Sequence, residues 1–142
     1  MGSFRVLVTG PRGWTAVEPV HRRLDLLLAI YGVLTVVHGA CPTGFDKICH
    51  NWALNAYHAS SYGAVIPEPH PAIWRVNGVF DRAAGFTRNA EMVALGAGLC
   101  LAGDMPCTDA KCRRQDPHRT HGTSHCADLA DKAGIPVEWI TP

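Results

Sequence analysis

A stretch near the C-terminal end of the chain is rich in side chains that bind metal ions. Residues 107–126 read CTDAKCRRQDPHRTHGTSHC, and six of these twenty residues are Cys or His. Thiolate sulfurs and imidazole nitrogens are preferred ligands of Zn²⁺, which structural sites hold in a tetrahedron of four. The stretch therefore predicts a structural zinc site, and the alternative is an exposed loop with incidental thiols and imidazoles.

The spacing of these residues narrows the ligand set. Cys107 and Cys112 are separated by four residues, which is within the range of known zinc sites. His125 and Cys126 are neighbours, and neighbours on a helix point in different directions, so at most one of them joins the site. The predicted ligands are Cys107, Cys112 and His118, with His121 or Cys126 as the fourth.

Four segments combine glycines with groups that bind anions. They read TGPRGW at 9–14, HGACPTGFD at 38–46, GFTRNAEMV at 85–93 and HGTSHC at 121–126. Glycine lets a ligand approach the backbone, Arg binds phosphate with two hydrogen bonds, and a helix start offers free N–H groups. The candidate ligand-binding residues are Gly10, Arg12, Trp14, Gly39, Thr43, Gly44, Asp46, Arg88, Asn89, Gly122, Thr123 and Ser124.

Two of these candidates also have ordinary structural roles. Trp14 either stacks on a base or sugar of the ligand or packs in the core. Asp46 either accepts a hydrogen bond from a ribose hydroxyl or caps the helix that follows it. Short glycine-rich turns are common, so the prediction of a binding site rests on several turns meeting at one place.

Hydrophobic periodicity predicts the elements that position these segments. The predicted strands are 4–10, 33–39, 62–66, 99–102 and 136–140, and the predicted helices are 17–30, 45–57, 88–97 and 123–133. Thr15, with Glu18 three residues later, and Thr87 are predicted N-caps. Residues 67–87 carry three Pro and two Gly and are predicted to form a long loop of the kind that is often functional.

Strands that alternate with helices predict parallel pairing through right-handed crossovers. The predicted fold class is therefore α/β, a Rossmann-like, doubly wound, mostly parallel five-stranded sheet with helices on both faces. Ligands of such sheets bind at the carboxyl ends of the strands, near the point where strand order reverses. We expect the four glycine-bearing segments to converge there on one pocket.

Length and composition are those of one globular domain. The chain has 142 residues, 47 % of them hydrophobic, and a net charge of +1. We expect a single domain over 1–142, with a Cys/His-rich loop at 103–126. No targeting leader or bilayer-spanning apolar run is visible, so we expect a cytoplasmic protein with reduced thiols and no membrane partner. The near-neutral charge disfavours duplex DNA as the main partner.

The four segments, in this order, resemble the SLOG superfamily. The sequences RVLVTGPRGW, VVHGACPTGFD, GFTRNAEMV and HGTSHCADLADKAGIPV carry the likeness, which extends over nearly the whole chain. This superfamily has a Rossmann-like domain and includes the LOG phosphoribohydrolases and the DNA-processing protein DprA. The small stand-alone branch common in actinobacteria and their phages is the most similar. The resemblance implies binding of a nucleotide or a nucleotide-derived ligand.

The resemblance also implies roles for individual residues. Gly10 and Arg12 match the family's first loop, Gly39, Gly44 and Asp46 the second, Arg88, Asn89 and Met92 the Arg-containing helix start, and Gly122 and Thr123 the final Gly-Thr pair. The hydrolase branch carries a longer Gly-Gly-x-Gly-Thr-x-x-Glu run, and Cys126 stands at the Glu position here. Cleavage of an N-glycosidic bond then lacks its expected acid or base. We therefore expect a sensor or sequestering module, with catalytic residues unassigned.

Two other functions stay open. One is a nucleoside monophosphate phosphoribohydrolase-like enzyme in which Glu91, Asp46 or Glu68 substitutes for the missing carboxylate. The other is a single-stranded nucleic-acid-binding protein, for which the arginines at 113, 114 and 119 give slight support. Analogy with the family also predicts a homodimer.

Overall fold

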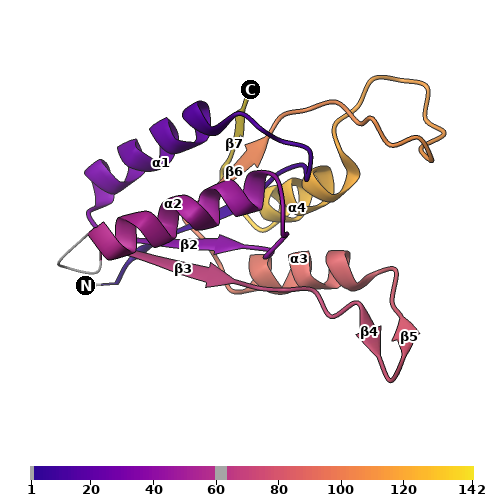
Figure 1. Cartoon of the computed structure of the whole chain (residues 1–142), viewed down its shortest axis with the longest axis horizontal. Coiled ribbons are helices and arrows are strands. Elements are labelled where there is room, and N and C mark those ends of the chain that lie inside the picture. The colour runs from indigo at the N-terminus through magenta and orange to yellow at the C-terminus, as the bar shows by residue number, and fades with distance from the viewer. Residues whose placement is uncertain (1, 60–63) are drawn as a thin grey trace.

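The computed structural model describes residues 2–59 and 64–142. A five-stranded parallel sheet lies at its centre, with the strand order β3-β2-β1-β6-β7 (Figure 1). The strands of this sheet are β1 (Phe4–Thr9), β2 (Leu34–His38), β3 (Val65–Pro69), β6 (Leu99–Gly103) and β7 (Val137–Ile140). The predicted strand 62–66 falls partly outside the described residues, because 62 and 63 are among those not described, and β3 continues beyond it to Pro69.

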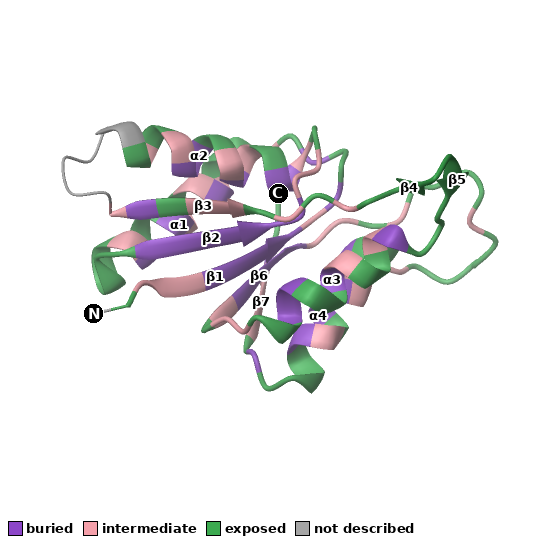
Figure 2. Cartoon of the chain, turned by 90° about the horizontal axis from the view of Figure 1, so that it is seen from below, coloured by how far each residue is buried: buried purple, intermediate pink, exposed green. Residues whose placement is uncertain are grey.

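Helices cover both faces of this sheet. They are α1 (Val17–Tyr31), α2 (Phe45–Ala59), α3 (Ala84–Ala94) and α4 (His121–Lys132). Helices α1 and α2 lie over one face, and α3 and α4 lie over the other (Figure 2). The chain is therefore a Rossmann-like, doubly wound α/β fold, as its alternating pattern predicts.

The alternation of side chains along the strands builds two core clusters. Val6, Val8 and Val36 pack under α1 and α2, whereas Leu7 and Val37 pack under α3 and α4. Successive side chains of a strand point to opposite faces, and here both faces are buried. The core strands consequently read as continuous apolar runs in the sequence.

Helix α1 begins at Val17, whereas an N-cap at Thr15 would require the helix to begin at residue 16. Its N-cap is Ala16, which makes no side-chain capping hydrogen bond, so the predicted Thr15 capping box is wrong. Pro19 accounts for the difference. A cap at Thr15 would require Pro19 to donate an N–H to the Thr15 carbonyl, whereas a start at Val17 places Pro19 among the residues whose N–H has no helical partner.

The segment predicted as a loop over 67–87 contains regular structure. It forms a two-stranded hairpin of β4 (Arg75–Val76) and β5 (Val79–Phe80), and then the first turn of α3. The predicted N-cap Thr87 is therefore wrong, since it lies inside the helix. At the helix start, the Asp81 carboxylate instead accepts a hydrogen bond of 2.9 Å from the N–H of Ala83.

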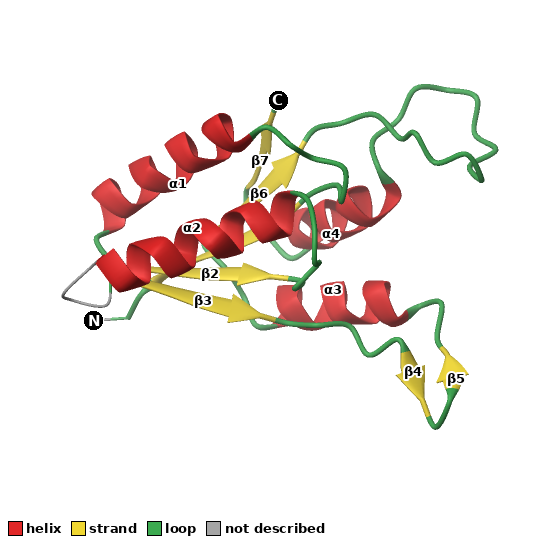
Figure 3. Ribbon diagram, viewed as in Figure 1, coloured by secondary structure: helices red, strands yellow, loops and turns green. Residues whose placement is uncertain are grey.

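Strand order reverses between β1 and β6. Two segments outside the main sheet project beyond the carboxyl ends of the strands there. One is the hairpin, and the other is the β6–α4 loop, residues 104–120 (Figure 3). The ends of this loop are joined by an isolated bridge between Pro106 and Arg119. Among the described residues, no helix combines the length and apolar character needed to cross a bilayer.

Candidate functional site

A pocket of about 500 Å³ opens at the carboxyl ends of the strands. All four glycine-bearing segments contribute to its lining, together with the hairpin and the start of the β6–α4 loop. The predicted residues that line it are Gly10, Arg12, Gly39, Asp46, Arg88, Asn89, Gly122 and Thr123. The expected convergence of these segments on one pocket is therefore observed.

The first two loops of the pocket interlock. The backbone N–H of Phe45 donates to the Pro11 carbonyl at 3.1 Å, and the Thr43 hydroxyl donates to the Arg12 carbonyl at 3.2 Å. Gly44 has a φ of 79°, and a Cβ there would collide with the carbonyls of Pro11 and Arg12. Thr43 and Gly44 thus contact the first loop and lie outside the pocket lining.

Asp46 is buried and holds the second loop closed. Its Oδ2 accepts a hydrogen bond from the Gly39 N–H at 3.1 Å. Burial raises the pKa of this carboxyl, whereas a hydrogen bond from Cys41 and the charge of Arg88 act in the opposite direction. The pocket therefore contains a carboxyl group that binds a proton more readily than an exposed aspartate does.

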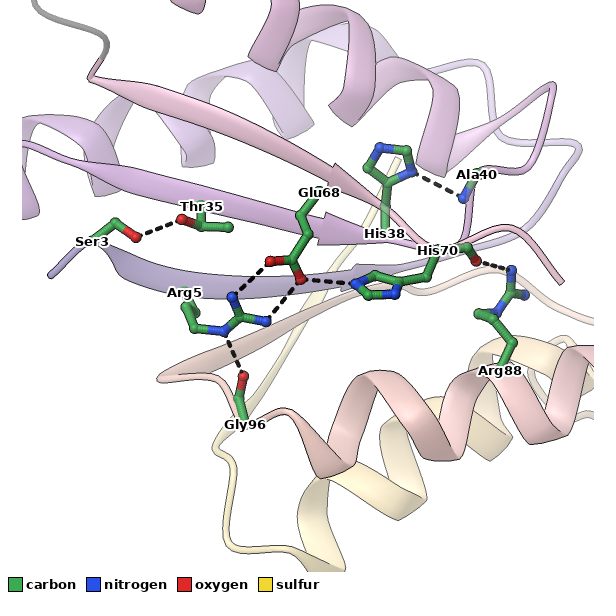
Figure 4. Close-up of polar contacts among 9 residues, drawn as sticks. All are labelled: Ser3, Arg5, Thr35, His38, Ala40, Glu68, His70, Arg88 and Gly96. Carbon is green, nitrogen blue, oxygen red and sulfur yellow. Dashed lines mark hydrogen bonds and ion pairs between the residues drawn. The ribbon is translucent and has the colours of Figure 1, made fainter.

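Arg88 extends from α3 to the ends of β2 and β3 (Figure 4). Its guanidinium donates to the carbonyl of Gly39 and, at 3.2 Å, to the carbonyl of His70. A side chain at position 39 would collide with this guanidinium, so glycine is needed for the close approach. These bonds fix the orientation of Arg88 at the pocket wall.

Helix α4 begins at the pocket. Gly122 and Thr123, in its first turn, belong to the lining, and the N–H groups of a first helical turn have no helical acceptor. The Asn89 side chain bridges α3 to this turn, donating to the Gly122 carbonyl at 3.4 Å. Ser124 lies outside the lining, and its N–H donates to the carbonyl of the N-cap residue Thr120. The helix start is thus held in register with α3.

Trp14 belongs to the core rather than to the pocket. Its side chain is 2 % exposed and packs edge-on against Phe45, with ring centroids 5.2 Å apart. The indole N–H donates to the Ala16 carbonyl at 2.7 Å. Trp14 therefore packs in the core, as the structural interpretation predicts, and lies outside the pocket lining.

Several lining residues were not expected from the sequence. Trp74, Arg82 and Phe86 come from the hairpin and the start of α3, and they add aromatic and cationic groups at the outer side of the pocket. The tryptophan ring stacks on Phe80 with centroids 5.9 Å apart. The only sequence feature that pointed to these residues was the length of the predicted loop at 67–87, which suggested a functional segment without identifying its binding residues.

A second polar cluster lies behind the second loop. His38 is 2 % exposed, and its Nδ1 accepts from the Ala40 N–H at 3.0 Å while its Nε2 lies 2.8 Å from Nδ1 of His50. Burial, together with the neighbouring His50, lowers the pKa of His38 to about 4. His38 is therefore a neutral, hydrogen-bonded residue of the strand end.

Four side chains of the Cys/His stretch form a group that could hold a metal ion. They are Cys107, Cys112, His118 and His121, and their ligand atoms all lie within 4.8 Å of one another. Nε2 of His121 lies 3.6 Å from Sγ of Cys107 and 3.4 Å from Sγ of Cys112. The two histidine Nε2 atoms are 3.0 Å apart.

These separations agree with a tetrahedral zinc site. Zn–S and Zn–N bonds of ordinary length in a tetrahedron place S and N about 3.6 Å apart and two N atoms about 3.3 Å apart. Nδ1 of His118 lies 2.7 Å from the Asp116 carbonyl, an acceptor that fixes the proton on Nδ1 and leaves Nε2 free to bind. Of the two alternatives for the fourth ligand, His121 is the one that lies with the other three predicted ligands.

Cys126 was the other candidate for the fourth ligand, and it lies outside this group. Its side chain is fully buried in the core cluster under α3 and α4, beside Cys100. Burial raises the pKa of its thiol to about 11. A cysteine one turn into α4 points toward the sheet, whereas the first residue of the helix, His121, faces the loop.

The arginines beside the metal-ligand group are mostly paired. Arg114 forms an ion pair with Asp116 at 2.6 Å, and Arg119 forms one with Asp104 at 2.9 Å. The guanidinium of Arg119 also lies 3.9 Å from the centre of the Trp139 ring. Neighbouring carboxylates thus pair with two of the three arginines that favoured nucleic-acid binding.

Comparisons with known proteins identify a family, a phage protein of similar sequence and a solved structure of similar fold. Residues 4–60 match the model of YAcAr, the YspA, cpYpsA-related SLOG family. The chain is 39 % identical over 135 residues to the Gene 61 protein of Mycobacterium phage D29, which covers 94 % of this chain and 93 % of that protein. A universal stress protein from Archaeoglobus fulgidus is similar in structure, with a TM-score of 0.48, 18 % identity and 99 % of each chain covered.

Proposed function

The chain belongs to the SLOG superfamily, and from that premise we propose that it binds a nucleotide or a nucleotide-derived ligand as a sensor or sequestering module. The observation that carries this proposal is the pocket itself, in which four separate loops meet at the point where strand order reverses.

The inner part of the pocket suits a phosphate. The first turn of α4 offers backbone N–H groups, while Arg12 of the first loop and Arg88 of α3 supply positive charge. Arg12 is exposed, and its guanidinium donates no hydrogen bond within the part of the chain that the structure describes. We therefore assign Arg12 as the principal cationic ligand and Arg88 as the group that also fixes the loops.

The outer part of the pocket suits a ring. Trp74 and Phe86 present aromatic surface on the side away from the strands. Stacking on an aromatic side chain favours any base without selecting among them. A ligand with a phosphate and a ring fits this arrangement better than inorganic phosphate alone does.

Isothermal titration with AMP, ADP and ADP-ribose tests the proposal. Wild-type protein should bind at least one of them, and Arg12→Ala should weaken that binding by about tenfold or more, since a hydrogen bond to a charged group contributes about 1.5–3 kcal/mol. Arg22→Ala is the matched control, because Arg22 is exposed on α1 and pairs with Glu18. Absence of heat with all three compounds would remove the proposal.

Asp46 favours a second candidate function, a phosphoribohydrolase-like enzyme. Of the three carboxylates considered as substitutes for the missing Glu, only Asp46 lines the pocket. Glu68 is bound by Arg5 at 2.9 Å, which lowers the pKa of its carboxyl to about 2. Chromatography for released base after incubation with nucleoside monophosphates decides between binding and cleavage, and Asp46→Asn must abolish any release that is seen.

We also propose that Cys107, Cys112, His118 and His121 hold a structural Zn²⁺. Two thiolates and two imidazoles form a complete tetrahedral set, which leaves no position for a reacting water. Metal analysis of purified protein should give one zinc per chain, and Cys112→Ala should lose it. A wild-type preparation that binds neither Zn²⁺ nor Co²⁺ would contradict this assignment.

A further inference from the structure

The metal-ligand group and the pocket share a wall. The lining of the pocket includes residues 105–109 at the start of the β6–α4 loop and residues 120–123 at the start of α4. Two of the metal ligands, Cys107 and His121, lie in these segments, whereas Cys112 and His118 lie outside the lining. A metal ion in this group would therefore tie together two sides of the pocket wall.

Apart from the Arg119–Asp104 ion pair and the contact of Arg119 with Trp139, few other contacts hold the β6–α4 loop in place. Its ends are joined by a 2.7 Å hydrogen bond from the Cys107 N–H to the His118 carbonyl and a 3.3 Å bond from the Thr120 N–H to the Met105 carbonyl. Between them, residues 108–117 are exposed apart from Cys112, which is half-buried. A segment with so little burial is ordered mainly by whatever closes it.

The charge of a metal complex here would be zero. Two thiolates cancel the two positive charges of Zn²⁺, and neutral imidazoles add none. A metal ion would consequently do little to attract an anionic ligand through charge. Its effect on the pocket must come from the position and mobility of the wall.

We propose that metal binding at this group and ligand binding in the pocket are coupled. The metal orders residues 105–109 and the first turn of α4, so the ligand no longer bears the entropic cost of ordering them. Coupling between sites is reciprocal, so the ligand raises the affinity for metal by the same factor, which is typically about 5- to 150-fold. This inference rests on the proposed function, since it assumes an anionic ligand in the pocket.

Calorimetry with AMP, ADP and ADP-ribose tests the coupling on three forms of the full chain. These are zinc-loaded wild type, chelator-stripped wild type, and Cys112→Ala, which removes a metal ligand without altering the pocket lining. Stripped wild type and Cys112→Ala should bind at least fivefold more weakly than zinc-loaded wild type. Lys111→Ala, an exposed neighbour with no ligand atom for the metal, is the matched control and should bind like wild type. Equal affinity in all forms overturns the coupling and leaves the proposed function intact.

Hydrogen exchange tests the ordering of the wall without any nucleotide. Added Zn²⁺ should slow exchange at the amides of 105–109 and 121–124 in wild type and leave them unchanged in Cys112→Ala. If zinc-loaded wild type binds none of the three nucleotides, the proposed function fails and so does the coupling to it, whatever the exchange shows. If nucleotides bind but Zn²⁺ leaves exchange at the wall unchanged, the coupling is overturned on its own.

Discussion

Gly44 shows how one residue fixes the relation between two loops. A side chain at this position meets both a left-handed backbone, at φ 79°, and the carbonyls of Pro11 and Arg12. Gly32 has a similar φ of 77°, but open space surrounds the place where its Cβ would lie. A comparison of substitutions at Gly44 and Gly32 therefore separates the cost of backbone strain from the cost of a steric clash between the two loops.

We expect Gly44→Ala to cost clearly more stability than Gly32→Ala. The left-handed conformation alone costs roughly 1–2 kcal/mol for a residue with a Cβ, and overpacking against backbone adds about 1–3 kcal/mol more at position 44. Urea unfolding of both variants measures the difference. Equal losses would mean that the two loops separate freely and that the interlock contributes nothing.

His38 should make the stability of the fold depend on pH. Its pKa is about 4 in the folded protein, against about 6.5 in an unfolded chain. The folded state binds fewer protons between these values, so the contribution is fully present above about pH 6.5 and is lost as pH falls toward 4. The loss should be on the order of 3 kcal/mol. Urea titrations at pH 7.5 and 4.5 should show a smaller loss for His38→Gln than for wild type, and parallel losses would rule out His38 as the cause.

At the scale of elements, the sequence predicted the strands, the middle of each helix and the starts of α1 and α2 well, but it predicted the N-caps and the start of α3 poorly. Apolar periodicity reports which face is buried, and that signal is strong across β1, β2 and α1. Starts depend on a few local hydrogen bonds, such as that of Asp81 to the N–H of Ala83, and on proline positions such as Pro19. The hairpin escaped prediction because its two-residue strands are too short to show a period.

The same contrast explains the site. Glycines and arginines that follow strands could be assigned to the pocket because parallel strands end at one edge. Trp74 and Phe86 could not, since their place depends on the path of the chain between β3 and α3, which no apolar period marks. The role of Trp14 was ambiguous because a tryptophan after a glycine-rich turn is equally suited to contact a ligand or to pack in a core. In the structure its ring packs against Phe45 in the core.

The hairpin should select for a ring in the ligand. Trp74→Ala is expected to weaken binding of a nucleotide by about 5- to 150-fold, since base stacking on an aromatic contributes about 1–3 kcal/mol, while inorganic phosphate should bind unchanged. Ile73→Ala is the matched control, because Ile73 is exposed and does not line the pocket. Calorimetry with AMP and with phosphate compares the variants, and an equal effect on both ligands would contradict a ring-binding role for Trp74.

For the whole molecule, the two core clusters and the metal-ligand group are separate. The core lies between the sheet and its helices, and none of Cys107, Cys112, His118 and His121 belongs to either cluster. Removal of a bound metal should therefore loosen the β6–α4 loop without dismantling the sheet. Since Zn²⁺ at a thousandfold excess over its Kd stabilises the folded state by about 4 kcal/mol, the melting temperature should still fall on chelation.

Limited proteolysis separates loosening of the loop from unfolding of the whole chain. Lys111, Arg113 and Arg114 are exposed trypsin sites inside the β6–α4 loop. Zinc-loaded protein should resist cleavage there, and stripped protein should be cut within 111–114 while far-UV circular dichroism stays close to that of the loaded form. Cys112→Ala should be cut with or without Zn²⁺, because it cannot close the loop. Cleavage spread over the sheet and helices after chelation would instead mean that the metal supports the entire fold.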